Sequence, residues 1–103
     1  MTVVVTAVFH PLPGRKEELA TAMQAGIEAV HGEKGCELYA IHDAEDGTIT
    51  MSEKWTTAED LGAHAGGAAE AILRGDIEDL LEKDTVVTRM TPLPVGSKEQ
   101  GQL

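Results

Sequence analysis

The segment GCELYAIHDAEDGTITMSEKW, from Gly35 to Trp55, decides the fold because it has the pattern of a β-hairpin. Apolar and polar residues alternate over 36–43 and again over 48–55, which is the period of a strand with one buried face. Asp46-Gly47 between them is typical of a tight turn, because glycine adopts positive φ without a steric penalty. The segment therefore predicts two antiparallel strands next to each other in a sheet.

The register of this hairpin depends on the number of residues in its loop. An even loop places on one face Cys36, Leu38, Ala40, His42, Ile49, Met51, Glu53 and Trp55. The opposite face then carries Tyr39, Ile41, Thr48, Thr50, Ser52 and Lys54. An odd loop or a bulge reverses the match, because a slip of one residue turns every side chain over. We take the even register as the expectation, with the first group facing the helices.

The remaining chain supplies two more strands and the helices. A β-branched run over 2–10 predicts a strand, with Val3, Val5, Ala7 and Phe9 on one side. Apolar residues at helical spacing predict a helix over 14–31. The T-x-x-E pattern of Thr56 and Glu59 predicts a helix that begins at about Thr57 and breaks at Gly66-Gly67. A further helix is expected over 68–82, with an apolar stripe of Ile72, Leu73, Ile77, Leu80 and Leu81, and a last strand over 84–93.

The order of elements is β-α-β-β-α-β, which is the ferredoxin-like split βαβ of the α+β class. Right-handed crossovers give one antiparallel sheet with the helices on one face. We expect one domain over residues 1–93, followed by a polar tail over residues 94–103. The second sheet face has no helices left to cover it, so its apolar residues predict a homodimer formed sheet to sheet. In the even register these are Val4, Val8, Tyr39 and Ile41.

Composition limits the kinds of partner. The chain has 103 residues, with 8 Lys and Arg against 18 Asp and Glu, which gives a net charge of −10. This charge argues against nucleic acid and anionic membranes as partners. The start of the chain lacks the basic region of a signal peptide, and no apolar run approaches the ~20 residues of a membrane span. A single cysteine, Cys36, cannot form an internal disulfide, so we expect a cytoplasmic protein.

Three residues near the end of the hairpin are candidates for a site. Trp55 either fills the gap between sheet and helix or contributes to a pocket, since buried aromatic residues mostly serve packing. His64 is either a histidine at a helix end or a general base that works near neutral pH. Glu53 shares a face with Trp55, and a buried carboxylate needs a partner. That partner is expected to be His64, His42 or Arg89, or else a structural hydrogen bond to the helix.

Three stretches together resemble the antibiotic biosynthesis monooxygenase (ABM) domain, especially its small members similar to quinol monooxygenases. They are PLPGRKEEL, GCELYAIH and ITMSEKWTTAEDLGAH, and the resemblance covers about residues 2–93. It implies a dimeric α/β barrel with a pocket between sheet and helices in each protomer. It also implies oxidation of a quinol or polyphenol by dioxygen, without flavin, haem or metal as a prosthetic group.

The resemblance also assigns roles to residues. The ABM pattern keeps a tryptophan at the position of Trp55 and a histidine after it, as His64 follows here. Trp55 would position a small aromatic substrate and His64 would take its proton. Glu53 is added from the residues alone, because a pairing with His64 would make it the carboxylate that orients the base. We expect these side chains to border one cavity, with substrate contacts from Ala7, Leu38, Met51 and His42.

Two other functions remain open. Haem-degrading relatives on this fold use an asparagine on the first strand, and that position falls on Ala7 here. The chain could instead be a non-catalytic dimeric barrel that binds a small aromatic ligand or responds to stress. A metal site is not expected, because the sequence has no H-E-x-x-H, no H-x-H and no pair of cysteines.

Overall fold

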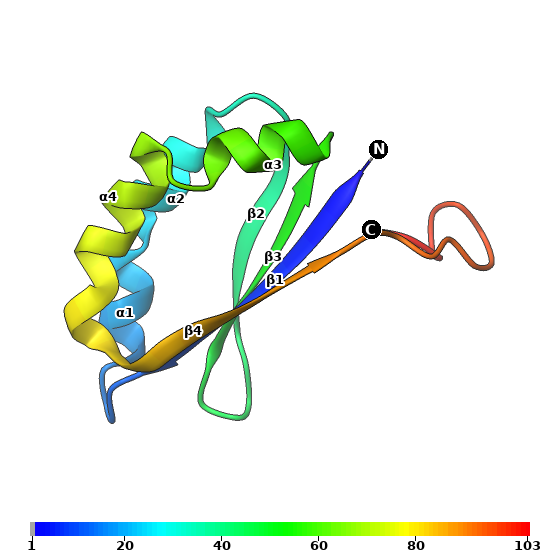
Figure 1. Ribbon diagram of the computed structural model, residues 1–103. Helices are drawn as coiled ribbons and strands as arrows, with labels where there is room; N and C mark the ends of the chain where they lie inside the picture. Colours follow the sequence, from blue (N-terminus) through cyan, green and yellow to red (C-terminus); the bar gives the residue numbers. More distant parts are fainter. Residues whose placement is uncertain (1) are drawn as a thin grey trace.

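The strands lie in the order β2-β3-β1-β4 in one antiparallel sheet, and all helices cover the same face of it (Figure 1). The computed structural model describes residues 2–103. The strands are β1 (Val3–Pro11), β2 (Cys36–Asp43), β3 (Ile49–Trp55) and β4 (Leu81–Met90). The helices are α1 (Lys16–Ala22), α2 (Gln24–His31), α3 (Ala58–His64), α4 (Ala68–Ile77) and the 3-10 turn η1 (Glu78–Leu80). This confirms the ferredoxin-like α+β fold expected from the sequence.

The core lies between the sheet and the helices. The predicted side of β1 is buried, with Val3, Val5, Ala7 and Phe9 all facing the helices. Leu19 and Met23 from the first helical segment and Leu73 and Ile77 from α4 pack over them. On β3 the buried residues are Ile49, Met51, Glu53 and Trp55, as the alternation of that strand predicts. We call this helix-covered side of the sheet the inner face, and the other side the outer face.

The hairpin register differs from the expected one. The Ala44 N–H donates to the Thr48 carbonyl, which closes a loop of Glu45, Asp46 and Gly47. Gly47 has a φ of 92°, which is the left-handed conformation typical of the last residue in a three-residue hairpin loop. This odd loop pairs Tyr39 with Glu53 and Ile41 with Met51, so Tyr39 and Ile41 face the helices. The even register was therefore wrong for β2, and its other residues Leu38, Ala40 and His42 lie on the outer face.

Several boundaries of the helices also differ from expectation. The helix expected over 14–31 divides at Met23, whose N–H is shared between the Leu19 and Ala20 carbonyls in a tight turn. The cap of α3 is Thr57 and not Thr56, because the Thr57 hydroxyl accepts the Asp60 N–H. Helix α4 ends at Ile77, and the last strand runs over Leu81–Met90 and not over 84–93.

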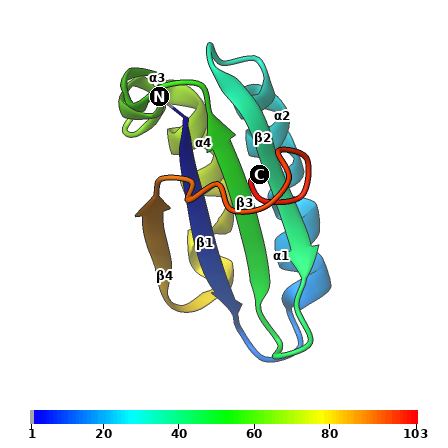
Figure 2. The ribbon, with the colours of Figure 1, turned by 90° about the vertical axis from the view of Figure 1, so that its right-hand side faces the viewer.

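Apolar side chains remain uncovered outside the core. Ile72, expected on the buried stripe of α4, is exposed. On the outer face, which Figure 2 shows from the front, Val4 and Val8 lie beside β4, whose Val86 and Met90 are exposed. Residues 91–103 contain no helix or strand and leave β4 on the side away from the helices (Figure 1). No helix within residues 2–103 is long and apolar enough to span a membrane.

Gly26 lets α2 lie directly against α4. A Cβ atom at this position would lie 2.6 Å from Leu73 Cβ and 2.7 Å from Leu73 Cα. Both are far below van der Waals contact, and the Leu73 backbone cannot swing away as a flexible side chain could. The glycine that interrupts the apolar stripe of the sequence is therefore a packing contact between the two helices that cover the sheet.

We expect Gly26→Ala to destabilise the fold by about 1–3 kcal/mol, because the added methyl group must push α2 away from α4. Gly75→Ala is the matched control, since Gly75 lies in α4 with open space around it. That change should stabilise the protein by about 0.5–1 kcal/mol through helix propensity. Urea denaturation of both variants checks this, and equal shifts of the two would contradict the close contact.

Candidate functional site

A cavity of about 270 Å³ lies between the inner face of β1 and β4 and the helices α3 and α4. Its lining is mostly apolar, with a few polar groups, which is the usual make-up of a small-molecule site. The apolar lining includes Val5, Ala7, Phe9, Leu61, Leu73, Ile77 and Val87. The titratable lining residues are Tyr39, Glu53, His64, Glu70, Arg74, Glu78 and Arg89.

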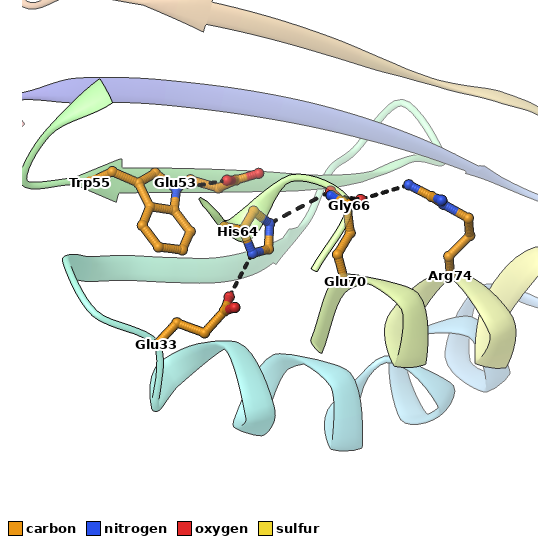
Figure 3. A network of polar contacts seen from close by, with 7 residues as sticks. All are labelled: Glu33, Glu53, Trp55, His64, Gly66, Glu70 and Arg74. Carbon is orange, nitrogen blue, oxygen red and sulfur yellow. Dashed lines mark hydrogen bonds and ion pairs between the residues drawn. The ribbon is translucent and has the colours of Figure 1, made fainter. Parts of the chain in front are cut away.

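His64, at the end of α3, is held in a fixed orientation inside the protein. Its side chain is 4% exposed, and its Nδ1 lies 2.7 Å from Glu33 Oε1 (Figure 3). Because an ionised carboxylate can only accept, the Nδ1–H donates to Glu33. In the neutral ring Nε2 is then the unprotonated nitrogen. Glu33 is outside the cavity lining, whereas Glu70, 3.8 Å from Nε2, is part of it, so the Nε2 edge faces the cavity.

Glu70 is balanced by its own partners. Its Oε1 accepts from Arg74 at 2.6 Å and from the Gly66 N–H at 2.9 Å (Figure 3). The Glu70–Arg74 pair is spaced i, i+4 on α4, and the Gly66 contact ties it to the turn that follows α3. The Glu70 carboxylate therefore fixes the turn that follows His64 in the chain. It makes no short hydrogen bond to His64 Nε2.

Trp55 is fully buried and supports the site from behind. Its Nε1–H donates to Glu53 Oε1 at 3.0 Å, and its ring lies 4.7 Å from the His64 ring, centroid to centroid. Tyr39 closes the group, with its ring 5.4 Å from His64 and 6.4 Å from Trp55. Trp55 is not part of the cavity lining, so within a protomer it packs against the histidine and does not contact a ligand in this cavity.

Burial changes the acidity of two groups at the cavity. The pKa of Glu53 is raised by burial, although the Trp55 hydrogen bond and the nearby His64 oppose the rise. The pKa of Tyr39 is also raised, first by burial and then by the nearby Glu53. The site therefore offers a neutral phenol, and a carboxyl group that takes up a proton more readily than an exposed glutamate.

One cross-strand row places polar groups along the cavity floor. Tyr39 pairs with Glu53, Glu53 with Val5, and Val5 with Arg89, so the row crosses β2, β3, β1 and β4 on the inner face. Neighbouring strands lie about 4.8 Å apart, so each step along the row has this length. Glu53 and Arg89 therefore lie on opposite sides of Val5.

The structure brings together part of the site expected from the sequence. Ala7, Glu53 and His64 line the cavity. Met51 is fully buried on the inner face but is not part of the cavity lining, so it does not make the substrate contact expected of it. Leu38 and His42 lie on the outer face, and His42 Nδ1 is 3.2 Å from the Thr50 carbonyl oxygen. The sheet therefore separates these two residues from the cavity. They were expected to line it because the even hairpin register was assumed.

Several residues at the site were missed. The partner of Glu53 is Trp55, and not His64, His42 or Arg89. Tyr39 was placed on the wrong face, and the glycine at the end of a three-residue loop was the signal that could have corrected it. Glu33 comes from a loop far along the chain from His64, Glu70 comes from the start of the next helix, and no sequence motif marks either residue. Arg74 and Arg89 were not predicted as lining residues.

Within the described residues, no group of three or more His, Cys, Asp or Glu side chains is arranged to hold a metal ion. Glu33 and Glu70 are close to His64 but lie on opposite edges of its ring, one at Nδ1 and one near Nε2. Their oxygens therefore do not converge with a ring nitrogen on one point, which a metal ion requires.

Residues 2–69 match the family described as antibiotic biosynthesis monooxygenase, a stretch that includes β1 through α3 and thus Trp55 and His64. The chain belongs to the ABM family. No match was found among curated proteins. The family assignment therefore rests on this sequence match, and the fold agrees with it.

Solved structures similar to this ABM protein share its whole fold. Rv0793 from Mycobacterium tuberculosis is 28% identical, with a TM-score of 0.82 over 94% of this chain and 100% of that one. A Nitrosomonas europaea protein named for antibiotic biosynthesis monooxygenase is 19% identical, with a TM-score of 0.81 over 92% and 94%. A conserved Methanosarcina mazei protein is 21% identical, with a TM-score of 0.79 over 87% and 91%. The last two likenesses concern the fold alone.

The buried Glu53 predicts a dependence of stability on pH. Because folding raises its pKa, its contribution to stability is complete below the pKa of the unfolded chain and is lost as the pH rises through the folded pKa. Glu53→Gln keeps an acceptor for the indole N–H but removes the charge. We expect this variant to be more stable than the parent at about pH 7, by on the order of 1 kcal/mol.

The gain from Glu53→Gln should shrink as the pH is lowered toward about 4, where the carboxyl group is protonated in both states. Glu45→Gln is the control, because Glu45 is an exposed glutamate in the hairpin loop. Thermal unfolding across this pH range measures both variants. A gain that is constant with pH, or one shared with Glu45→Gln, would show that burial of the Glu53 charge is not its cause.

Proposed function

We propose that this ABM protein is a cofactor-independent monooxygenase that oxidises a quinol or polyphenol with dioxygen. The observation that carries the proposal is the buried His64, whose Nδ1 is fixed by Glu33 and whose Nε2 edge faces a mostly apolar cavity. A base in such a place takes a proton from a bound phenol while water is kept away from the product anion. Membership of the ABM family supports the same reaction class.

In the proposed mechanism most of the reactivity belongs to the substrate. His64 Nε2 removes the phenolic proton, and the electron-rich anion gives one electron to dioxygen. The two radicals recombine as a peroxide on a ring carbon that carries hydrogen. Loss of one molecule of water then leaves a new carbonyl group, so one oxygen atom enters the ring and the other leaves as water.

The other polar groups at the cavity have supporting roles in this proposal. Glu33 holds the tautomer of His64 and stabilises the imidazolium that forms when the ring takes the proton. Trp55 keeps the plane of the ring in place, since the two rings are tilted by only 30°. Tyr39 lines the cavity with its pKa raised, so its hydroxyl remains a donor for the substrate oxygen.

Oxygen uptake with a panel of hydroquinones tests the function. We expect His64→Ala to lower kcat/KM by roughly 10²–10⁴-fold, the usual loss on removing a general base. Glu33→Gln should lower kcat, because His64 loses the carboxylate that holds its tautomer and stabilises the imidazolium. Glu33→Asp should recover part of the activity.

Arg15→Gln serves as a control for this experiment, because it changes a charge in an exposed ion pair far from the cavity. Oxidation by His64→Ala at the rate of the parent would remove His64 as the base. Binding of aromatic compounds without any oxygen uptake by the parent would favour the non-catalytic barrel. A Glu33→Gln variant that folds normally and has the kcat of the parent would give Glu33 a structural role only.

We also infer that the protein acts as a homodimer through its outer face. The sheet has helices on one side only, and apolar side chains on the other side include Val4, Val8, Val86 and Met90. Residues 91–103, which leave β4 on the same side (Figure 1), include the exposed apolar residues Leu93, Val95 and Leu103. Removal of such apolar surface from water stabilises an assembly by roughly 25 cal/mol per Å². A second copy of the chain packed on the outer face would bury this surface.

Val86→Lys should weaken association, because it places a charge on the outer face beside Val8, where Val86 is 55% exposed in the protomer. Ile72→Lys is the matched control, because Ile72 is 48% exposed but lies on α4, on the helical side. Light scattering over a concentration series compares the two. A parent protein that stays monomeric at micromolar concentration would contradict the dimer, and so would equal effects of the two substitutions.

A further inference from the structure

Arg89 is a cation at the cavity whose charge no residue in the described chain balances. Within residues 2–103 it takes part in none of the ion pairs and none of the side-chain hydrogen bonds, whereas Arg74, the other arginine of the lining, is bound to Glu70. Lys34, Lys83 and Lys98 also form no ion pair within these residues, but Arg89 is the unpaired cation that lines the cavity. Its position therefore points to a partner that comes from outside the chain.

The cross-strand row places Arg89 opposite the proton-transfer groups. Arg89 on β4 and Glu53 on β3 both flank Val5 on the inner face, so their Cα atoms are about 10 Å apart across two strand spacings. His64 and Tyr39 lie at the Glu53 end of the row, and Arg89 lies at the other end. The floor between the two ends is apolar, formed by Val5 and Ala7 with Val87 beside them.

We propose that the substrate is an aromatic acid: a hydroxylated ring that lies over Val5 and Ala7, with a carboxylate on a short side chain bound by Arg89. The guanidinium group matches a carboxylate with two parallel hydrogen bonds, which fixes direction as well as position. The hydroxyl at the other end of the ring then meets His64 Nε2. This inference rests on the proposed oxidation only for the identity of the group that meets His64.

The charge of the rest of the protein makes Arg89 decisive for such a substrate. A net charge of −10 repels anions in general, and Glu70 and Glu78 line the same cavity. Glu70 is offset by Arg74, so the end of the cavity near Arg89 is where a carboxylate gains attraction. A neutral ring could enter in either direction, whereas an acid is turned with its hydroxyl toward His64.

Binding of a matched pair of compounds tests the proposal without relying on turnover. The probes are 2,5-dihydroxyphenylacetate and its amide, which have the same shape but differ in charge. Trp55 is the single tryptophan, and its ring stacks on His64 at the cavity, so its fluorescence reports binding. We expect the parent to bind the acid about tenfold or more tightly than the amide, the effect of one charge-assisted pair.

Variants then assign the preference to Arg89. Arg89→Gln should remove the preference by weakening only the acid, and Arg89→Lys should keep part of it. Lys83→Gln is the matched control, because it removes a positive charge from the same strand outside the cavity lining and should leave the preference intact. Since Arg89 is exposed in the protomer, the preference should also shrink as salt is raised.

Equal affinity for the acid and the amide in the parent, or no binding of either, overturns the proposal. A preference that persists in Arg89→Gln, or that disappears in Lys83→Gln as well, also overturns it, because the general field and not Arg89 would then select the acid. Oxygen uptake with the same compounds separates the two proposals. An acid preference that depends on Arg89, without any oxygen uptake, supports the aromatic-acid site and contradicts the monooxygenase.

Discussion

The three-residue loop that ends in Gly47 is the constraint on which the site depends. Positive φ at Gly47 lets the chain reverse after an odd number of residues, and this fixes which residues of β2 face the helices. With one residue more or fewer, Leu38 and Ala40 would face the helices, and Tyr39 would lie on the outer face. Tyr39 would then neither border the cavity nor pack beside His64. A short turn at one end of the sheet thus determines which side chains of β2 face the cavity.

The sequence was sufficient for features that depend on local alternation. The face of β3 was predicted because this strand carries its own alternation, and so Glu53 and Trp55 were expected on the helical side. The face of β2 could not be assigned in the same way, because Tyr39 and Ile41 on one side of the strand are as apolar as Leu38 and Ala40 on the other. The loop sets which side of β2 faces the helices, because one residue more or fewer in the loop turns every side chain of the strand over. Thr56 and Thr57 posed the same difficulty, since either threonine has an acidic residue three positions later.

The partners of the site residues depend on contacts between distant segments, and this is why sequence patterns did not find them. Glu33 precedes β2 and His64 ends α3, yet their side chains share a hydrogen bond. Glu70 meets both the turn after α3 and Arg74. Within residues 2–103 each buried side-chain nitrogen or oxygen atom has a hydrogen-bond partner, as the low polarity of the interior requires. Such a cluster holds its side chains in one geometry at some cost in stability. The raised pKa of Glu53 reflects this cost, because burial disfavours the ionised carboxylate.

The central position of β1 has a consequence for how the protein folds during its synthesis. β1 pairs with β3 on one side and β4 on the other, and both follow it by many residues along the chain. Before α4 and β4 are made, β1 has an unpaired edge and its apolar residues lack α4 as a cover. Pairing between distant strands also slows folding, because a long loop must close before its contacts form. The sheet therefore remains incomplete until β4 has been synthesised, and this is the period in which its exposed apolar residues and open edge favour aggregation.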